Sequence, residues 1–316
     1  MLNLDALKVF LTVAEHSNFS EAGRQLHLSQ PAVSQIIQGL ERQLGAQLFS
    51  RSGRAAQLTE AGQVLASMAR ELLTSAQRVE QTILSLQGEI VGEISIGCST
   101  ASGKYLLPGL IARFRREYPQ VRINVLVTSR ESVISKLLTG ETSLAVSSKQ
   151  IEHNDLEYQD FFKDDIALIV PADHRWAKFR HIYPDDLLDE PMILREEVAG
   201  TREVLMDGLL KHDISPDMLN VAMVLGNAEA IEMAVEEGLG VAFVSRLAAS
   251  RGIALGRVVE VVVEGMELTR NIFLARNRRL PLTRAQAKFW EFVTCTRDEI
   301  QNTGRTDADR EKVLNK

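Results

Sequence analysis

The sequence contains few of the features that mark secreted, membrane-spanning or metal-binding proteins. Its 316 residues include only two cysteines, Cys98 and Cys295, which form neither a disulfide framework nor a metal-ligand spacing. No apolar run approaches the roughly 20 residues that a membrane helix needs. The N-terminus lacks the basic start and apolar core of a signal peptide. We therefore expect a cytoplasmic protein with no metal site and no membrane partner.

The motifs of common enzyme classes are also missing. The sequence has no G-x-S-x-G, no G-x-x-x-x-G-K-[ST], no H-E-x-x-H and no dinucleotide-binding glycine run. Its six histidines show no paired placement. We assign no catalytic residue and no cofactor, although a two-lobed α/β enzyme stays open as an alternative.

Positive charge is scarce for a nucleic-acid-binding protein. The net charge is −6, and within residues 1–60 five basic side chains are balanced by five acidic ones. Only Arg51 and Arg54 cluster, so the basic surface that usually marks a DNA-binding domain is weak. Binding to DNA would then require two copies that engage one duplex together.

What is present is a helix pair between Phe19 and Leu44, with a turn at His27-Leu28. Ser20 is expected to cap the first helix, and Ser29 the second, in which Pro31 occupies the first turn. Gly45 is expected to end the second helix. The apolar positions that are expected to face inward are Ala22, Leu26 and Leu28, and then Val33, Ile36 or Ile37, Leu40 and Leu44.

The opposite face of the second helix is polar. It carries Gln30, Ser34, Gln35, Gln38 and Arg42. Glutamine can pair with adenine through two hydrogen bonds, and serine can reach base edges or phosphates. The arrangement fits a helix-turn-helix, but the pattern alone fits two ordinary packed helices equally well.

Residues 1–62 also resemble the N-terminal domain of LysR-type transcriptional regulators. The segments that carry the resemblance are LDALKVFLTVAEHSNFSEAGRQLHLSQPAVSQIIQGLERQLGAQLFSR and LTEAG. The resemblance favours DNA binding over simple packing. It implies a wing at Gln47–Thr59, whose arginines would contact the backbone or the minor groove. The residues expected to contact DNA are Ser29, Gln30, Pro31, Ala32, Ser34, Gln35, Gln38, Arg51 and Arg54.

A long helix is expected from Glu60 to about Gln87, capped by Thr59. It would extend about 40 Å, and its single apolar stripe indicates pairing with a second copy. The stripe comprises Leu65, Met68, Leu72, Ala76, Val79, Ile83 and Leu86.

Beyond residue 92, strands and helices alternate in two similar rounds. The pattern predicts parallel sheets in two lobes that enclose a cleft. The first round has strands at 93–98, 121–127 and 143–147 and helices at 105–118 and 131–139. After a strand at 166–171, the second has strands at 192–194, 219–225 and 241–245 and helices at 202–210 and 228–237. A strand at 270–275 and a helix at 283–300 return to lobe one.

This half resembles the effector-binding domain of the same family, itself similar to periplasmic binding proteins. The segments GKYLLPGLIARFRREYPQVRINV and EEGLGVAFVS carry the likeness. Ser143 departs from it, because the family commonly has an acidic residue there. The whole chain is thus expected to be α/β, with an N-terminal winged helix-turn-helix, a long linker helix and a two-lobed effector domain.

Hydroxyl- and amide-rich turns follow several of the expected strands. Helix N-termini with such donors suit a small anion, for example an organic acid. Arg202 could grip a carboxylate through two hydrogen bonds. Equally, each of these residues could simply cap a helix. Cys98 next to such a turn could be a redox sensor, or merely buried packing. The candidate effector-binding residues are Ser99, Thr100, Ser102, Thr128, Thr201, Arg202 and Asn227.

The expected organisation is a DNA-binding domain (1–60), a dimerisation helix (61–88), an effector domain (89–301) and a polar tail (302–316). Lobe one would comprise about 93–162 and 268–301, and lobe two about 163–267. The expected function is effector-dependent transcriptional regulation, with promoter double-stranded DNA, a small-molecule effector and a homodimer or homotetramer as partners. A DNA-binding architectural protein without an effector is the other alternative.

Overall fold

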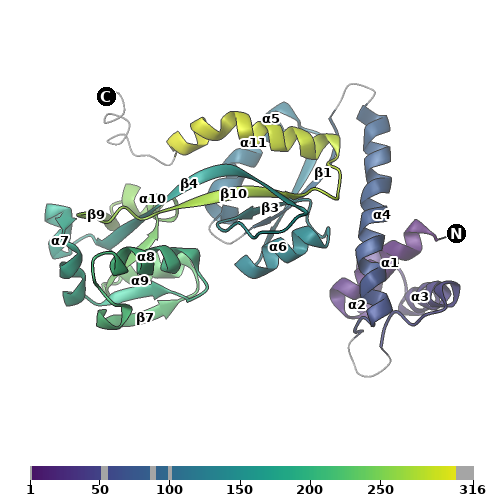
Figure 1. Cartoon of the computed structure of the whole chain (residues 1–316), viewed down its shortest axis with the longest axis horizontal. Coiled ribbons are helices and arrows are strands. Elements are labelled where there is room, and N and C mark those ends of the chain that lie inside the picture. Colours follow the sequence, from purple (N-terminus) through teal and green to yellow (C-terminus); the bar gives the residue numbers. More distant parts are fainter. Residues whose placement is uncertain (1, 51–55, 86–89, 99–101, 304–316) are drawn as a thin grey trace.

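A computed structural model describes residues 2–50, 56–85, 90–98 and 102–303. Its N-terminal domain packs three helices around one core: α1 (Leu4–His16), α2 (Phe19–Leu26) and α3 (Gln30–Leu44). Phe10, Val33 and Leu40 lie fully or almost fully buried between them. The core is small, and it is completed by the first turns of a fourth helix (Figure 1).

The ends of these helices confirm some of the expected caps and correct others. Ser29 accepts a hydrogen bond from the backbone N–H of Ala32, and Gly45 ends α3 with a φ of 68°. Ser20 does not cap α2, which starts one residue before it. Asn18 accepts from the N–H groups of Ser20 and Glu21 instead. Leu28 and Leu44 lie at the surface rather than in the core, 37% and 40% exposed.

Gly23 explains how closely α2 and α3 approach. A Cβ atom at Gly23 would lie 2.7 Å from the carbonyl oxygen of Leu28. The absence of a side chain there lets the turn fold back onto α2. After α3, an antiparallel bridge joins Phe49 and Leu58 at the base of the expected wing. Arg51 and Arg54, predicted for its tip, lie outside the described residues.

The helix α4 (Glu60–Ser85) stands beside the effector domain and joins it to the DNA-binding domain (Figure 1). The Thr59 hydroxyl accepts a hydrogen bond from the N–H of Gly62 at its start, as predicted. Leu65 is buried in the N-terminal core, so the first member of the expected dimerisation stripe has another role. Met68 and Val79 are 58% and 61% exposed.

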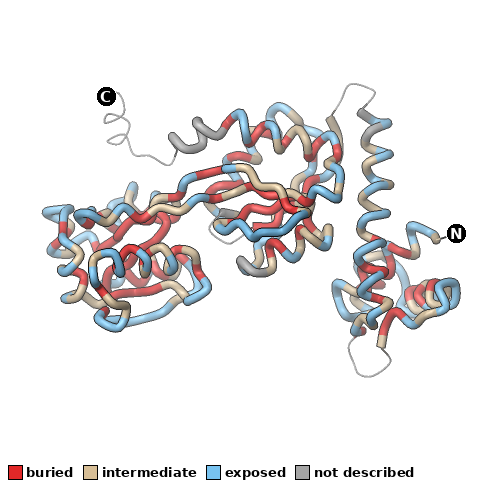
Figure 2. The backbone as a smooth tube through the Cα atoms, in the orientation of Figure 1, coloured by how far each residue is buried: buried red, intermediate tan, exposed pale blue. Residues whose placement is uncertain are grey.

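Lobe one is built on three parallel strands: β2 (Val121–Val127), β1 (Gly92–Cys98) and β3 (Leu144–Ser147). Its helical segments are η1 (Ser102–Leu106), α5 (Leu107–Glu117), α6 (Arg130–Leu138) and α11 (Arg284–Thr303). Phe114 and Phe289, from α5 and α11, are fully buried against the strands. Figure 2 shows this buried layer between the exposed outer faces of the helices.

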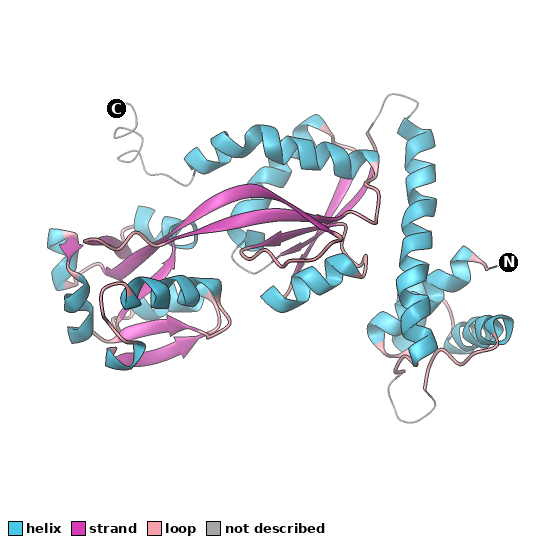
Figure 3. Ribbon diagram, in the orientation of Figure 1, coloured by secondary structure: helices cyan, strands magenta, loops and turns pink. Residues whose placement is uncertain are grey.

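Two long antiparallel strands connect the lobes. The strand β4 (Leu156–Pro171) runs from one lobe into the other, and β10 (Thr269–Asn277) returns beside it (Figure 3). We expected only residues 166–171 as a strand and only parallel sheets. Both expectations were wrong, since β4 begins ten residues earlier and the described sheet is mixed. The polar side chains of Gln159, Asp160 and Lys163 hid the apolar alternation in its first half.

Lobe two surrounds the parallel strands β7 (Val221–Leu225), β6 (Met192–Arg195) and β8 (Val241–Ser245). It also contains α7 (Arg175–Phe179), β5 (His181–Ile182), η2 (Pro184–Asp189), α8 (Gly200–Leu210), η3 (Pro216–Met218), α9 (Ala228–Glu236), α10 (Arg246–Ala254) and β9 (Val258–Val263). The sequence did not predict α7, α10, β5, β9 or the short helical turns η2 and η3. Most are too short for a clear hydrophobic period. None of the described helices is long and apolar enough to span a membrane.

Candidate functional site

The first candidate surface is the outer face of α3. The side chains of Gln30, Gln35 and Gln38 are exposed, and Ser34 is half-buried beside them. Nε2 of Gln30 donates a hydrogen bond to Oγ of Ser34 over 3.1 Å, so the two side chains form one polar unit. Ser29 and Pro31 are also exposed, and Ala32 is half-buried, at the start of the same helix. The face is uncharged over these positions, which suits base edges better than phosphates.

The second candidate is a cavity of about 120 Å³ between the two lobes. Lobe one contributes Thr128, Ser129, Ser147 and Ser148, and lobe two contributes residues 198–201. Arg195, Glu196 and Arg270 complete the charged part of the lining. This volume suits a small anion rather than a large molecule. The predicted residues Thr128 and Thr201 therefore do lie at one cavity, although they are 73 positions apart in the chain.

The start of α8 is the strongest anion-binding feature of this cavity. Its N-cap residue, Ala199, has no side chain that could accept a hydrogen bond from the first turn. Ala199, Gly200 and Thr201 line the cavity, and Thr201 is 97% buried. By contrast, Ser129 caps α6 by accepting from the N–H of Ser132. The uncapped N–H groups of α8 and the positive end of its dipole favour an anion here.

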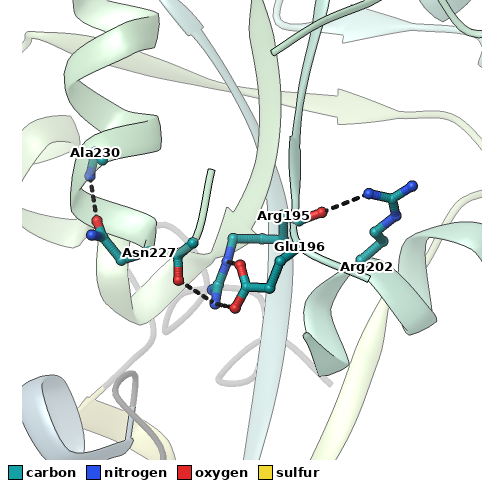
Figure 4. Close-up of polar contacts among 6 residues, drawn as sticks. Arg195, Glu196, Arg202, Asn227 and Ala230 are labelled. Carbon is teal, nitrogen blue, oxygen red and sulfur yellow. Dashed lines mark hydrogen bonds and ion pairs between the residues drawn. The ribbon is translucent and has the colours of Figure 1, made fainter. Parts of the chain in front are cut away.

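Arg195 and Glu196 form a local ion pair on the lobe-two side of the cavity (Figure 4). Nε and Nη2 of Arg195 donate to the two oxygens of Glu196 over 3.0 and 2.8 Å. Nη2 also donates to the carbonyl oxygen of Gly226. Burial raises the pKa of Glu196, but hydrogen bonds from Arg195 and from its own backbone outweigh it and hold that pKa below the ordinary value. Most of this arginine's charge is thus already compensated.

The second arginine, Arg270, lies where the connecting strands cross between the lobes. Its Nε and Nη2 donate to Oδ2 of Asp164 over 2.8 and 2.7 Å, and Ser245 donates to Oδ1 of the same carboxylate. Asp164 is 4% exposed, so this is a buried network. Such a network fixes the geometry between β4, β8 and β10 more than it attracts a ligand.

Two predicted effector residues do not line this cavity. Arg202 is not part of its lining, and Nη1 of Arg202 donates to the carbonyl oxygen of Arg195 over 2.9 Å (Figure 4). It borders a neighbouring hollow of the surface instead. Asn227 caps α9, since its Oδ1 accepts from the N–H of Ala230 over 2.7 Å. The structure therefore does not bring Arg202 and Asn227 together with Thr128 and Thr201 at this cavity, because each side chain is engaged with the backbone of its own lobe.

The predicted turn after β1 can be placed only in part. Ser99 and Thr100 lie outside the described residues. Ser102 is the first residue of η1, and only its backbone is described. Cys98, directly before them, is fully buried. Burial raises the pKa of its thiol to about 11, so the reactive thiolate is scarce near neutral pH. This cysteine packs in the core of lobe one, which favours packing over redox sensing.

The sequence alone did not indicate Ser147, Arg195, Glu196 or Arg270. Ser147 ends the buried strand β3, Arg195 ends β6, and Glu196 directly follows β6. Their position at or directly after the carboxyl end of a strand was the sequence signal that could have identified them, because ligands bind at these ends in α/β sheets. Arg270 had none, because its place depends on the unpredicted pairing of β4 with β10.

Comparisons with known proteins identify both halves of the chain. Residues 4–63 match the family described as bacterial regulatory helix-turn-helix protein, lysR family, and residues 87–297 match the LysR substrate binding domain. A relative from Cyanidioschyzon merolae named probable RuBisCO transcriptional regulator is 35% identical over 277 residues, which cover 87% of this chain and 91% of the relative.

Two solved structures share the fold. Full-length CbnR complexed with its target DNA has a TM-score of 0.65 and 24% identity, with 93% of this chain and all of that chain covered. The regulatory domain of Synechocystis CcmR in complex with 2-PG has a TM-score of 0.59 and 25% identity. It covers 65% of this chain and 97% of that one.

Proposed function

The chain belongs to the LysR family of transcriptional regulators, and from this premise we propose how it works. It binds promoter DNA as a homo-oligomer, and a small anion between the two lobes alters that binding. The chain is a regulator and not an enzyme. The cytoplasm, where promoter DNA is accessible, is its proposed location.

We propose that the DNA-binding unit comprises residues 1–60 and reads bases through α3. Gln30, Ser34, Gln35 and Gln38 would contact base edges, and the N-terminus of α3, at Ser29, Pro31 and Ala32, would face the backbone. Arg51 and Arg54 of the wing would add phosphate or minor-groove contacts. Support comes from the exposed, uncharged polar face of α3.

Residues 61–88 would form the dimerisation helix, and other surfaces could join further copies. On α4, Val64, Met68, Leu72, Val79 and Ile83 are each 46–61% exposed along one side. In the effector domain, β2 and β7 are the outer strands of the path through the described sheet, and both expose apolar side chains. Exposed apolar edges of this kind are usually covered by a partner.

We propose the effector domain at 89–301, with lobe one at about 93–162 and 268–301, lobe two at about 163–267, and 302–316 as a tail. Thr128, Thr201 and the turn with Ser99, Thr100 and Ser102 would hold the effector. The CcmR domain was solved in complex with 2-PG. By analogy, small carboxylate and phosphate anions are the proposed effector class for this chain.

The single observation that carries this proposal is the uncapped N-terminus of α8, which opens onto the cavity between the lobes. The direct experiment titrates the full-length protein with DNA upstream of its own gene, alone and with each of a panel of small carboxylates and phosphates. We expect specific binding whose affinity or complex mobility changes with one compound or a closely related group. Specific binding that no anion changes would instead support an architectural DNA-binding protein.

A further inference from the structure

A second, larger hollow adjoins the anion cavity between the lobes. Its volume is about 640 Å³, against about 120 Å³ for the anion cavity. Ser147 of lobe one and Val198 of lobe two line both spaces, so the two spaces meet at these side chains. The larger space, which we call the side hollow, is therefore the adjoining room for any part of a ligand that the anion cavity is too small to hold.

The side hollow follows one face of α8. Arg202 and Met206 line it and are four residues apart, which places them one above the other on the same side of the helix. Asp207 is the last residue of α8 in the lining. From Gly200 to Asp207 the helix rises about 10 Å at 1.5 Å per residue. The side hollow thus offers a path of that length, and the path starts at the helix N-terminus where the anion is proposed to bind.

The apolar part of the lining comes from both lobes. Lobe one contributes Ile134, which is 3% exposed, and Ile151, which is 45% exposed. Lobe two contributes Val198, which is 60% exposed, and the half-buried Met206. The backbone N–H of Ile151 donates to Oη of Tyr158 over 3.0 Å, which fixes the position of this isoleucine. An apolar group in the side hollow would remove the partly exposed side chains from water.

The charges of the lining select against a second anionic group. The described lining carries three carboxylates and two cationic side chains. Each cation has a partner in the protein. Nζ of Lys149 lies 3.9 Å from Oε1 of Glu203, and Nη1 of Arg202 donates to the carbonyl oxygen of Arg195 (Figure 4). An anionic substituent would meet this excess of negative charge, whereas an uncharged hydrocarbon group would not.

We propose that the side hollow, lined by Ile134, Ile151, Val198 and Met206, takes an uncharged hydrocarbon tail of the effector. The effector is then a small carboxylate or phosphate that carries an aliphatic group. This inference rests on the proposed function, which places the anionic head at the start of α8. Because the tail contacts both lobes, it stabilises the arrangement in which the lobes lie close together.

The test measures binding of acetate, butanoate, hexanoate and octanoate to the full-length protein by calorimetry at constant pH and ionic strength. We expect the affinity to rise about twofold for each added methylene group, which is half the transfer free energy of a fully buried one, because much of the lining stays partly exposed. Hexylamine and 1-hexanol have a similar tail without the anionic head, and they should bind much more weakly than hexanoate.

The other outcomes separate this inference from the proposed function. Equal affinity for short and long carboxylates would overturn the tail site and leave the anion cavity standing. If neither the carboxylates nor inorganic phosphate bind, both the tail site and the anion cavity are wrong. Binding of hexylamine or 1-hexanol as tightly as hexanoate would show unspecific apolar binding and would also reject the tail site.

Two variants distinguish the tail from the head of the ligand. Ile151→Asn replaces a partly exposed side chain that lines the side hollow but not the anion cavity. It should weaken octanoate binding severalfold and leave acetate binding unchanged. Thr201→Val alters the anion cavity alone and should weaken binding of every carboxylate by a similar factor.

The matched control is Val262→Asn. Val262 is an apolar residue of β9 that is 46% exposed and lines neither space. This variant should bind octanoate as wild type does. Equal losses of octanoate affinity in Ile151→Asn and Val262→Asn, or no loss in Ile151→Asn, would contradict the proposed lining of the tail site.

Discussion

At the scale of single residues, the start of each helix separates structural side chains from functional ones. Asn18, Ser29, Ser129 and Asn227 each satisfy backbone N–H groups of their own helix. Ala199 cannot do so at the start of α8. The difference is chemical, since only a side chain with an acceptor atom can replace the water or ligand at a helix N-terminus. An uncapped start that faces a cavity is therefore a ligand-binding feature.

The same reasoning gives a prediction for Thr201. Thr201→Val should weaken effector binding by about tenfold, because it removes one hydroxyl donor and keeps the packing of the buried side chain. DNA binding without effector should stay unchanged. Calorimetry with the identified anion measures the first effect. The control is Thr139→Val at an exposed threonine of lobe one. Equal affinity of wild type and Thr201→Val would remove Thr201 from the site.

A second residue-scale prediction concerns base reading. Gln30→Ala should weaken specific DNA binding by about 1–3 kcal/mol per reading helix, the range for a paired contact to a base. Non-specific binding should hardly change, since this glutamine carries no charge. The matched control is Gln43→Ala, an exposed glutamine on another side of α3. Competition titrations with operator and random DNA distinguish the outcomes, and equal losses on both would argue against base contact.

At the scale of elements, α4 carries two opposed surfaces with different chemistry. Its apolar side is exposed in a single chain, while its polar side lies against lobe one. Apolar stripes on long helices are stable only when covered. We therefore propose that the helix connects one chain to a partner through its apolar side, while its polar side lies against lobe one.

The apolar side of α4 should not tolerate a charged residue if it is the dimer interface. Met68→Glu should shift the protein from dimer toward monomer, because a buried carboxylate at the paired stripe is costly. Gln63→Glu, at an exposed polar position of the same helix, should leave the dimer intact. Sedimentation equilibrium at micromolar concentration measures both. A Met68→Glu protein that dimerises as tightly as wild type would exclude this stripe from the interface.

Elements with a clear period were predictable, and those without one were not. The helix α4 and the strands β2 and β8 agree with their predicted bounds to within two residues. The first half of β4 was missed because its stability comes from pairing with β10, more than 100 positions away in the chain. The same pairing places Arg270 at the cavity, so that part of the site was also not predictable. Local pattern identifies elements but not long-range pairing.

At the scale of the whole molecule, ion pairs join the two lobes in addition to β4 and β10. Nζ of Lys149 in lobe one lies 3.9 Å from Oε1 of Glu203 in lobe two. A closer pair is that between Nζ of Lys104 and Oε1 of Glu229, at 2.7 Å, which joins η1 of lobe one to α9 of lobe two. Burial raises the pKa of Glu229, but hydrogen bonds from Lys104 and Tyr105 and from its own backbone outweigh it and hold that pKa below the ordinary value. A partly exposed pair of this kind contributes modestly to the closed arrangement.

Lys104→Met should therefore open the lobes slightly and weaken effector binding a fewfold, because the closed state becomes less populated. Lys288→Met removes a comparable ion pair within α11 and should have neither effect. The distance between labels on α5 and α9 reports the opening. Unchanged distances and effector affinity in Lys104→Met would show that this pair does not hold the lobes together.

We propose that an anion between the lobes changes how α3 engages DNA some distance away. The most direct measurement compares nuclease protection of the DNA upstream of the protein's own gene, with and without the effector, for wild type and Thr201→Val. We predict that the effector changes the length or spacing of the protected region for wild type. At the same effector concentration, the protected region of Thr201→Val should change much less. Protection that no anion alters, or that changes equally for both proteins, would show that the cavity at Thr201 does not control how α3 engages DNA.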